Sequence, residues 1–205
     1  MKTEQEIFWQ GEFGDAYIER NNSAQIVASN THFFSRATSS VTERPLTAIE
    51  FGSNIGLNLK ALRNLYPAIE TTAVEINAEA ANSVELNEVA NQVHNMSIFD
   101  YTPMTVFDLV LIKGVLIHLN PERLAEAYQT LHDATGKHLL VAEYYNPNPV
   151  GISYRGHDNK LFKRDFAGEI LDQFPNLELI DYGFNYRRDP KFPMDDITWF
   201  LIRKS

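Results

Sequence analysis

The order of apolar and polar positions along the chain changes near residue 46. Residues 4–36 have a helical pattern interrupted by aromatic side chains. After residue 46, short apolar runs alternate with amphipathic stretches, which is typical of βαβ units and a parallel sheet. This pattern predicts strands at the following ranges: Thr47–Phe51, Thr71–Ile76, Gln92–Ser97, Asp108–Lys113 and His138–Glu143.

Two connecting helices have clear boundary signals. Asn120 followed by Pro121 predicts a helix start, because the Asn side chain can cap the first turn and proline needs no hydrogen bond there. Gly136 is expected to end this helix. A later helix, with apolar residues at helical spacing, is expected to end at Pro175.

The last part of the chain has a different pattern. Leu177–Ile180 and Ile197–Ile202 predict two strands, and the stretch between them lacks helical periodicity. Two strands joined in this way are most simply antiparallel neighbours. We therefore expect one α/β domain over residues 1–205, with a mostly parallel seven-stranded sheet, helices on both faces and a C-terminal antiparallel hairpin.

Composition narrows the function classes. The chain has 205 residues, no cysteine and a formal charge of -9. The missing cysteines exclude disulfides and thiolate chemistry, and they fit a cytoplasmic location. The negative charge makes nucleic acid a poor partner. No apolar run reaches the roughly 20 residues that span a bilayer, so we expect no membrane contact. The sequence leaves the oligomeric state open.

The first candidate binding motif follows the first predicted strand. In Glu50-Phe51-Gly52-Ser53-Asn54-Ile55-Gly56, glycines allow backbone N–H groups to approach a ligand, and a helix begins after them. The acidic Glu50 would repel a pyrophosphate and attract a cation. A simple strand-to-helix turn remains the alternative explanation for the glycines alone.

The second motif is an acidic residue in register with the first. Glu75 ends the second predicted strand, 25 residues after Glu50. A carboxylate at this position can accept hydrogen bonds from both hydroxyls of a ribose. Considered alone, Glu75 is equally compatible with a solvated strand end.

These motifs, with residues 107–119 (FDLVLIKGVLIHL), resemble those of class I S-adenosylmethionine (SAM)-dependent methyltransferases. The resemblance covers residues 46–145 and implies a Rossmann-like fold, with SAM as the cofactor and S-adenosylhomocysteine as its product. Residues 1–40 would then form a helical cap, and residues 146–205 would supply substrate-side loops and the hairpin. Asn54 departs from the family pattern, since many members have a glycine there.

Segments outside this core resemble a particular subfamily, the methylases associated with pseudaminic acid biosynthesis. The resemblance is carried by residues 8–9, 11–22, 143–147, 154–157, 161–169 and 195–200. It implies a sugar-related acceptor, and it does not by itself establish which one.

By position, the resemblance assigns cofactor contacts along the core. Gly52 and Gly56 would hold the methionine end, and Glu75 would hold the ribose. Glu50, Asn54 and Ile76, beside them in the sequence, are expected cofactor contacts as well. The remaining expected contacts are Ser97 and Ile98 beside adenine, Lys113 and Gly114 beneath the sulfonium, Trp9 and Tyr17 as cover, and Arg20 at the carboxylate. Trp9 and Tyr17 are equally compatible with core packing.

Candidate catalytic residues follow the fourth and fifth predicted strands. An alcohol acceptor needs a nearby base, whereas an amine needs only to arrive unprotonated. His157, expected in a polar loop broken by Gly156, is the first candidate base. Glu143 and Tyr144 are further candidates. His118, within an apolar run, is expected to pack or to support the acceptor.

Acceptor contacts are expected from Tyr145 and Asn146 and from a basic cluster. The cluster comprises Arg155, Lys160, Lys163 and Arg164, and it would suit the carboxylate or phosphate of an acidic sugar. A solvated helix start is the alternative for this charge run. No His, Asp or Glu grouping has metal-ligand spacing, so no metal is expected.

The sequence thus predicts a methyltransferase acting on a small polar acceptor, an acidic nonulosonate-type sugar or sugar nucleotide. Transfer to an amine or carboxylate of another metabolite is the alternative within enzymes. A catalytically silent SAM-binding module is the alternative outside them. Glu50 and the antiparallel tail disfavour a nicotinamide-dependent enzyme.

Overall fold

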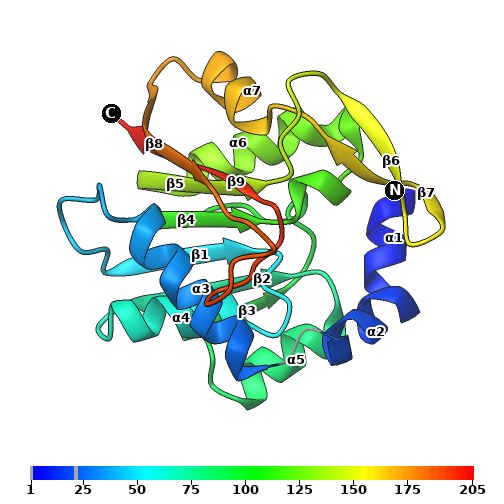
Figure 1. Cartoon of the computed structure of the whole chain (residues 1–205), viewed down its shortest axis with the longest axis horizontal. Helices are drawn as coiled ribbons and strands as arrows, with labels where there is room; N and C mark the ends of the chain where they lie inside the picture. Colours follow the sequence, from blue (N-terminus) through cyan, green and yellow to red (C-terminus); the bar gives the residue numbers. More distant parts are fainter. Residues whose placement is uncertain (1, 21–22) are drawn as a thin grey trace.

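A central sheet of seven strands organises the molecule (Figure 1). The computed structural model describes residues 2–20 and 23–205. The sheet order is β3-β2-β1-β4-β5-β9-β8. The strands are β1 (Thr47–Phe51), β2 (Glu70–Glu75), β3 (Gln92–Asn95), β4 (Phe107–Lys113), β5 (Thr135–Glu143), β8 (Leu177–Phe184) and β9 (Thr198–Lys204).

The strand directions confirm the predicted topology. Strands β1 to β5 run parallel to one another. Strand β9 is antiparallel both to β5 and to β8. The sheet is therefore mostly parallel and is completed by a C-terminal antiparallel hairpin, as the apolar runs in the tail predicted.

Helices cover both faces of the sheet. One face packs against α3 (Ala24–Ala37), α4 (Leu57–Leu65) and α5 (Ala78–Leu86), and the other against α6 (Leu124–Ala134) and α7 (Phe166–Gln173). Two short 3-10 helices, η1 (Leu116–His118) and η2 (Pro121–Arg123), connect β4 to α6. No helix in the described part of the chain has the length and apolarity to cross a membrane.

Alternating apolar side chains of β4 supply both halves of the core. Leu109 and Leu111 pack toward α3 and α4, whereas Val110 and Ile112 pack toward α6 and α7. Successive side chains of a strand point to opposite faces, so a strand covered on both faces is apolar throughout. This explains why the run after Asp108 has no polar interruption before Lys113.

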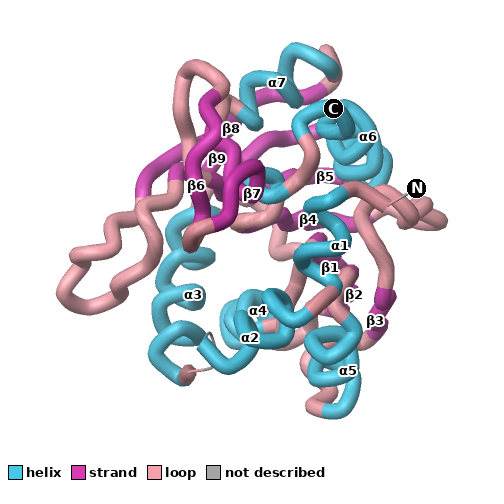
Figure 2. Tube along the Cα trace, turned by 90° about the vertical axis from the view of Figure 1, so that its right-hand side faces the viewer, coloured by secondary structure: helices cyan, strands magenta, loops and turns pink. Residues whose placement is uncertain are grey.

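Two N-terminal helices lie across the carboxyl ends of the strands (Figure 2). They are α1 (Glu4–Gln10) and α2 (Glu12–Arg20). The first helix begins with a capping box: the Thr3 hydroxyl accepts from the Glu6 N–H, and the Glu6 carboxylate accepts from the Thr3 N–H. The segment that the sequence predicted as a helical cap is therefore three helices, α1 to α3.

The sequence missed a second, two-stranded sheet. Strands β6 (Val150–Tyr154) and β7 (His157–Lys163) pair antiparallel, where a polar loop was expected around His157. Their two-residue turn places Arg155 at φ 50 and Gly156 at φ 85. Two positive φ angles suit the twist of a hairpin, so Gly156 closes a turn and does not break a loop.

The expectation that Gly136 ends α6 was wrong. The helix ends at Ala134, and Gly136 lies inside β5. A Cβ atom at Gly136 would lie 3.0 Å from the Phe107 carbonyl oxygen. The glycine therefore permits close approach of β4 and β5 at the start of their pairing.

Candidate active site

A cavity lies between the carboxyl ends of β1, β2 and β4 and the two N-terminal helices. Its volume is about 210 Å³, many times the roughly 10–15 Å³ that one water needs. Ligands of open α/β sheets bind at this edge of the sheet. The cavity is therefore suited to an organic molecule.

Most of the predicted cofactor residues line this cavity. They are Trp9, Tyr17, Gly52, Asn54, Glu75, Ile76, Ser97, Ile98, Lys113 and Gly114, and His118 joins them. Their functional roles remain predictions. The side chain of Arg20 lies outside the described part of the structure.

The loop after β1 brings backbone to the cavity floor. Gly52 has φ 74, and a Cβ atom there would lie 2.4 Å from Val115 Cγ2. Only glycine fits without strain at such a position. Asn54 has φ 48, in the left-handed region that Asn tolerates better than most residues. Asn54, which stands where many family members have glycine, therefore keeps the backbone conformation of the loop.

Gly56 and Glu50 lie behind the residues that form the cavity floor, and they do not line the cavity. Gly56 precedes α4 with φ 76, and a Cβ atom there would lie 2.5 Å from Val89 Cγ1. Its conformation and its close packing require glycine. The contact of Gly56 with the methionine end stays a prediction.

Glu75 is fixed by the backbone on both sides. Its Oε2 atom accepts from the Asn54 N–H at 2.7 Å, and its Oε1 atom accepts from the Asn77 N–H at 2.8 Å. Burial raises the pKa of Glu75, and these backbone N–H groups oppose that shift. The Ile76 N–H acts in the same direction. A carboxylate has about four acceptor positions, so not all of them are taken by the backbone.

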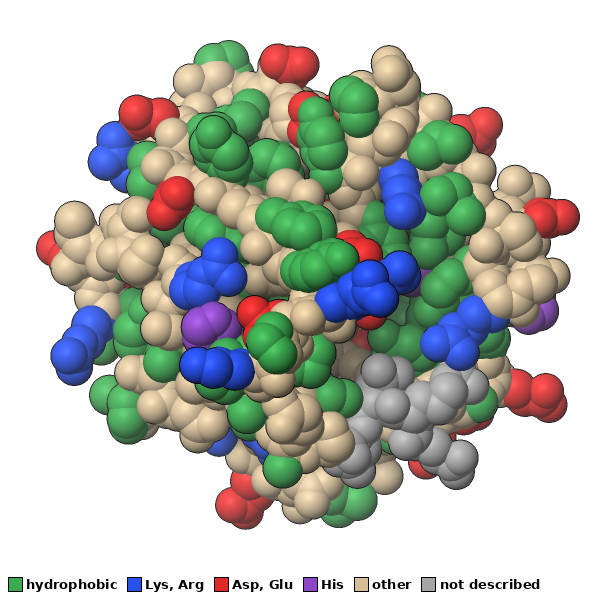
Figure 3. Space-filling view, viewed as in Figure 1, with side chains coloured by type: hydrophobic (Ala, Val, Ile, Leu, Met, Phe, Trp, Pro, Cys, Tyr) green, Lys and Arg blue, Asp and Glu red, His purple; other side chains and the backbone are tan. Residues whose placement is uncertain are grey.

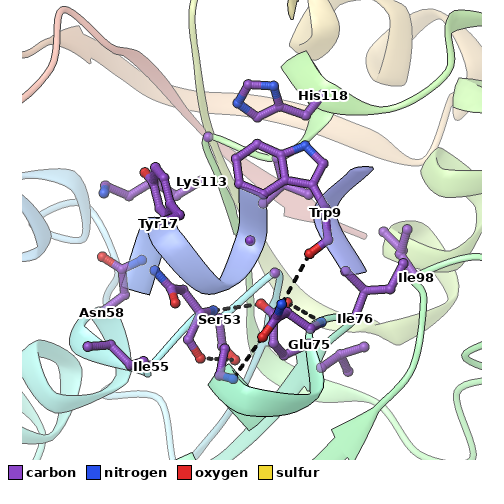
Figure 4. A pocket seen from close by; sticks show the side chains of 18 of the residues that line it. Trp9, Tyr17, Ser53, Ile55, Asn58, Glu75, Ile76, Ile98, Lys113 and His118 are labelled. Carbon is purple, nitrogen blue, oxygen red and sulfur yellow. Dashed lines mark hydrogen bonds between the residues drawn. The ribbon is translucent and has the colours of Figure 1, made fainter. Parts of the chain in front are cut away.

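The two ends of the cavity differ in polarity (Figure 4). Ile76 and Ile98 lie at one end, while Lys113, Tyr17 and Asn58 lie at the other. Glu75 and Ser53 lie on the floor between them. The cavity therefore suits an elongated ligand with an apolar ring at one end and a charged group at the other.

Two buried titratable groups lie at the polar end: Lys113 in the cavity wall and Glu50 behind it. Burial raises the pKa of Glu50 to about 8, whereas the Asn58 amide and the Lys113 ammonium oppose this shift. Burial lowers the pKa of Lys113, whereas the carboxylates of Glu50, Asp195 and Glu143 oppose that shift. Asn58 Nδ2 donates to Glu50 Oε1 at 2.5 Å.

His118 is buried at the end of η1 and joins the cavity wall. Burial lowers its pKa to about 4, which keeps the imidazole neutral near pH 7. Its Nδ1 atom lies 2.5 Å from the Lys160 carbonyl oxygen. A carbonyl can only accept, so Nδ1 carries the proton and Nε2 keeps its lone pair.

Aromatic side chains of α1 and α2 cover the cavity. The Trp9 ring lies 4.7 Å from the His118 ring and 5.4 Å from the Tyr17 ring. Phe13 packs at 5.3 Å from Trp9 and at 5.9 Å from Tyr154 of β6. Trp9 and Tyr17 therefore line the cavity and also take part in packing, and their role as cover for a cofactor stays a prediction.

The three predicted catalytic residues lie outside the cavity wall. Glu143 is 3% exposed, and its Oε1 atom accepts from the Val115 and Leu116 N–H groups at 2.9 Å each. Tyr144 is half-buried, and burial together with Asp195 raises its pKa. His157 is exposed and packs its ring 5.0 Å from Phe8. Their catalytic roles remain predictions, and the geometry favours a supporting role for Glu143.

The predicted acceptor residues also lie beyond the cavity wall, and the structure divides the basic cluster. Lys160 is buried and pairs with Glu4 of α1, and Arg164 pairs with Glu169 at 2.6 Å. Lys163 lies 5.1 Å from the centre of the Tyr144 ring. The alternative of a solvated helix start was wrong, because Lys160 and Lys163 lie in β7.

The remaining members of this group are at or near the surface. Arg155 is exposed in the hairpin turn, and Tyr145 is exposed after β5. Asn146 bonds to the Asn148 carbonyl oxygen at 2.5 Å. On the face shown in Figure 3, Lys and Arg side chains are scattered among other residue types, outside the atoms drawn in grey.

Sequence reasoning missed several polar residues of the cavity wall. They are Gln5, Glu6, Asn30, Asn58 and Asn77. Asn77 caps α5 and donates to Asp15 of α2 at 2.7 Å. Its capping role could have been predicted, because Asn is a preferred residue at a helix start. Its contact with α2 could not, because no neighbouring residue in the sequence indicates it.

A metal site is not formed by the described residues: they contain no group of three or more His, Asp or Glu side chains placed to hold an ion. Cysteine is absent from the whole chain.

Comparison with solved structures identifies the fold. A magnesium protoporphyrin IX methyltransferase from Synechocystis matches with a TM-score of 0.69 and 13% identity, over 100% of this chain and 99% of that one. The chain has the class I methyltransferase fold. A SAM-dependent methyltransferase from Leishmania major matches with a TM-score of 0.70 and 13% identity, over 100% and 87% of the two chains.

A third similar structure shows a filled site. The 1,6-didemethyltoxoflavin N1-methyltransferase of Burkholderia thailandensis contains its acceptor and S-adenosylhomocysteine. It matches with a TM-score of 0.68 and 12% identity, over 94% of this chain and 83% of that one. No protein-family model and no curated protein matches this chain. These comparisons establish the fold and leave the function to the site.

Proposed function

We propose that the chain binds SAM in the cavity and transfers the SAM methyl group to a small-molecule acceptor. The observation that carries this proposal is Glu75, a buried carboxylate held by two backbone N–H groups beside the Gly52 loop. Its position at the end of β2 suits the two hydroxyls of a ribose. Similar structures bind SAM or S-adenosylhomocysteine on this fold.

The residues of the cavity fit such a cofactor. Buried polar atoms without a partner in the described structure include Trp9 Nε1, Asn58 Oδ1 and Gln5 Oε1, all from residues of the wall. A buried polar atom needs a partner, so these atoms favour a polar ligand. A Cβ atom at Gly114 would meet nothing within 4 Å, so this glycine leaves space in the cavity.

When bound, SAM supplies an electrophilic methyl group, and the protein aligns and desolvates the acceptor. His118 is the residue placed to receive a proton, because its Nε2 lone pair is free of the Lys160 contact. Its low pKa makes it a weak base that stays unprotonated at neutral pH. It therefore takes the place that the sequence had given to His157.

For the acceptor, we propose an acidic sugar of the nonulosonate type or its nucleotide. The support is the resemblance of residues 8–9, 11–22, 143–147, 154–157, 161–169 and 195–200 to methylases of pseudaminic acid biosynthesis. Lys163 and Arg155 have no ion pair in the described structure, so they remain available for a carboxylate or phosphate. Lys160 and Arg164 are already paired.

Calorimetric titration with SAM and, separately, with NAD tests the cofactor. We expect SAM alone to bind, and Glu75→Ala to weaken binding by about 1–3 kcal/mol through lost charged hydrogen bonds. An unchanged affinity would contradict the ribose assignment. Nonulosonate sugars and their nucleotides are then screened for release of S-adenosylhomocysteine. Tight SAM binding with no turnover on any acceptor would favour the silent module.

A further inference from the structure

A second cavity, the amino-end cavity, lies near the start of β5 and the end of β9, at the opposite edge of the sheet from α1 and α2. In Figure 1 this edge is on the left, beside the C-terminus, whereas α1 and α2 lie on the right. The wall is formed by residues of β5, β8 and β9 and of the segment between α3 and β1. The volume is about 180 Å³, many times the roughly 10–15 Å³ that one water needs.

Positive side chains gather in the wall of this cavity, although the chain as a whole is acidic. The full chain has 18 Lys and Arg residues against 27 Asp and Glu residues. Among the described residues, the wall instead has three cations, Lys137, Arg203 and Lys204, and one carboxylate, Glu43. Cations around one depression repel one another, and an anion between them removes that repulsion. The wall therefore favours an anionic ligand.

The pairing of β5 with β9 brings these charges together. His138 of β5 lies opposite Arg203 of β9, and Lys137 precedes His138 in the chain. Burial lowers the pKa of His138, and the positive charges of Arg203 and Lys137 lower it further, whereas Asp108 opposes the shift. The cations therefore outweigh the nearby carboxylate at the His138 ring.

Two of the carboxylates that pair with these cations lie mostly in solvent. Lys137 Nζ lies 3.2 Å from Glu43, whose side chain is 78% exposed. Arg203 pairs at 2.6 Å with Glu178, whose side chain is 63% exposed. Pairs between exposed side chains contribute little, so both can give way to a ligand. Asp108 is less exposed and lies 3.1 Å from Lys137 Nζ, so it keeps that ammonium at the wall.

The donors of the wall suit a group with several oxygens. Lys204 Nζ uses one of its three hydrogens on the His132 carbonyl oxygen, at 2.7 Å. Arg203 has five N–H donors in a planar fork that matches phosphate geometry. The Thr42 hydroxyl adds a further hydrogen-bonding group. A carboxylate offers two oxygens to these donors, whereas a phosphate group offers at least three and a larger negative charge.

We infer that the amino-end cavity binds a phosphate group, held between Lys137 and Arg203, with Glu43 displaced from Lys137. The phosphate is either free inorganic phosphate or the end of a phosphate monoester. The volume of the cavity leaves room for an organic group beside the phosphate, and Ile180 supplies an apolar wall for it. The inference is independent of the proposed function, because none of these residues lines the cavity at the carboxyl ends of the strands.

Calorimetric titration of the wild-type protein tests the site. The ligands are orthophosphate, glycerol 3-phosphate and acetate, in about 0.15 M sodium chloride, which screens exposed charges. We expect at least one of the two phosphates to bind at least about tenfold more tightly than acetate, because it makes more charged hydrogen bonds. Equal or tighter binding of glycerol 3-phosphate, relative to orthophosphate, assigns the site to monoesters. Weaker binding of the ester assigns it to free phosphate.

Two variants locate the binding. Lys137→Gln and Arg203→Gln should each weaken the binding of the tighter phosphate by about tenfold, because each removes a charged partner. The matched control is Arg187→Gln. It removes a cation that pairs with Asp196 at 3.5 Å outside the amino-end cavity, so phosphate affinity should not change.

Nuclear magnetic resonance of the His138 ring gives a readout that needs no variant of the cations. A phosphate between Lys137 and Arg203 offsets their charge, so the pKa of His138 should rise when the ligand is added at constant ionic strength. An unchanged pKa of His138, or equal phosphate affinity of the wild type and both variants, overturns the inference, because phosphate then binds elsewhere. A wild-type affinity for both phosphates no higher than that for acetate overturns it as well.

Discussion

The floor and the roof of the cavity are built in different ways. The floor consists of the loops that follow β1, β2 and β4, where the backbone N–H groups of Asn77 and Asn54, 2 and 21 residues from Glu75, hold its carboxylate. The roof consists of α1, α2 and the β6–β7 hairpin, whose side chains meet across large sequence separations. Gln5 Nε2, for example, donates to the Asn159 carbonyl oxygen, 154 residues away.

This difference has consequences for both prediction and stability. A floor made of local loops is specified by short motifs, whereas the roof depends on contacts between distant segments. Elements held by few side-chain contacts open at a lower free energy than a central sheet does. We therefore expect substitutions in the floor to affect ligand binding most, and substitutions in the roof to affect it less.

The largest expected effect is that of Gly52→Ala. A Cβ atom there would overlap Val115 Cγ2 in a backbone with φ 74, so SAM binding should weaken by about 100-fold or more. The matched control is Gly156→Ala, which has φ 85 but open space around the Cβ position. Calorimetry that found equal SAM affinities for the two variants would contradict the special role of the floor.

Trp9→Ala tests the roof. The variant removes the ring that contacts Tyr17 and His118, and SAM binding should weaken by about tenfold through lost burial of the ligand. Phe192→Ala, which removes an aromatic ring stacked on His32 outside the cavity wall, is the control. A loss as large as that of Gly52→Ala would show that roof and floor contribute equally.

Glu143 supports the floor, because it holds the N–H groups of the segment that leads from β4 to His118. Burial raises its pKa to about 7, above the ordinary value of 4.5. Folding thus favours the neutral form of Glu143. The contribution of this group to the free energy of unfolding is complete below pH 4.5 and falls as the pH rises to 7. The slope is at most about 1.4 kcal/mol per pH unit.

Glu143→Gln should therefore flatten the decrease of unfolding free energy between pH 4.5 and pH 7. Chemical denaturation at several pH values measures this slope, with Glu178→Gln, an exposed residue of β8, as the control. An unchanged slope would mean that the Glu143 carboxyl group titrates at its ordinary pKa in the folded protein.

The smallest expected effect is that of Gln5→Ala. The variant removes the 3.1 Å hydrogen bond between α1 and β7, and one such neutral bond contributes about 1 kcal/mol or less. Amide hydrogen exchange over residues 150–163 should become faster, while SAM affinity changes by less than about threefold. Unchanged exchange would show that other contacts fix the hairpin.

The sequence was informative where structure is local. Alternation of apolar runs predicted the sheet and its antiparallel tail, and the spacing of Glu50 and Glu75 predicted two acidic strand ends. Asn54 remained an apparent departure until its φ of 48 showed that Asn keeps the loop conformation. Each of these features depends mainly on the residues of the motif and on their immediate neighbours in the sequence.

The same reasoning failed where distant segments meet. Lys160 looked like part of a solvated charge run, yet it is buried because Glu4 of α1 covers and pairs with it. His118 looked like a packing residue because its neighbours are apolar. Its tautomer depends on the Lys160 carbonyl oxygen, 42 residues away, which no local pattern could indicate.

The position of β9 also constrains how the chain can fold during synthesis. Strand β9 follows β8 in the chain but lies between β5 and β8 in the sheet. Until residues 198–204 leave the ribosome, one edge of β5 has no strand to pair with, and β8 cannot join the sheet. Nascent chains should therefore present an open apolar edge until β9 has been made, a stage at which protection by chaperones would matter most.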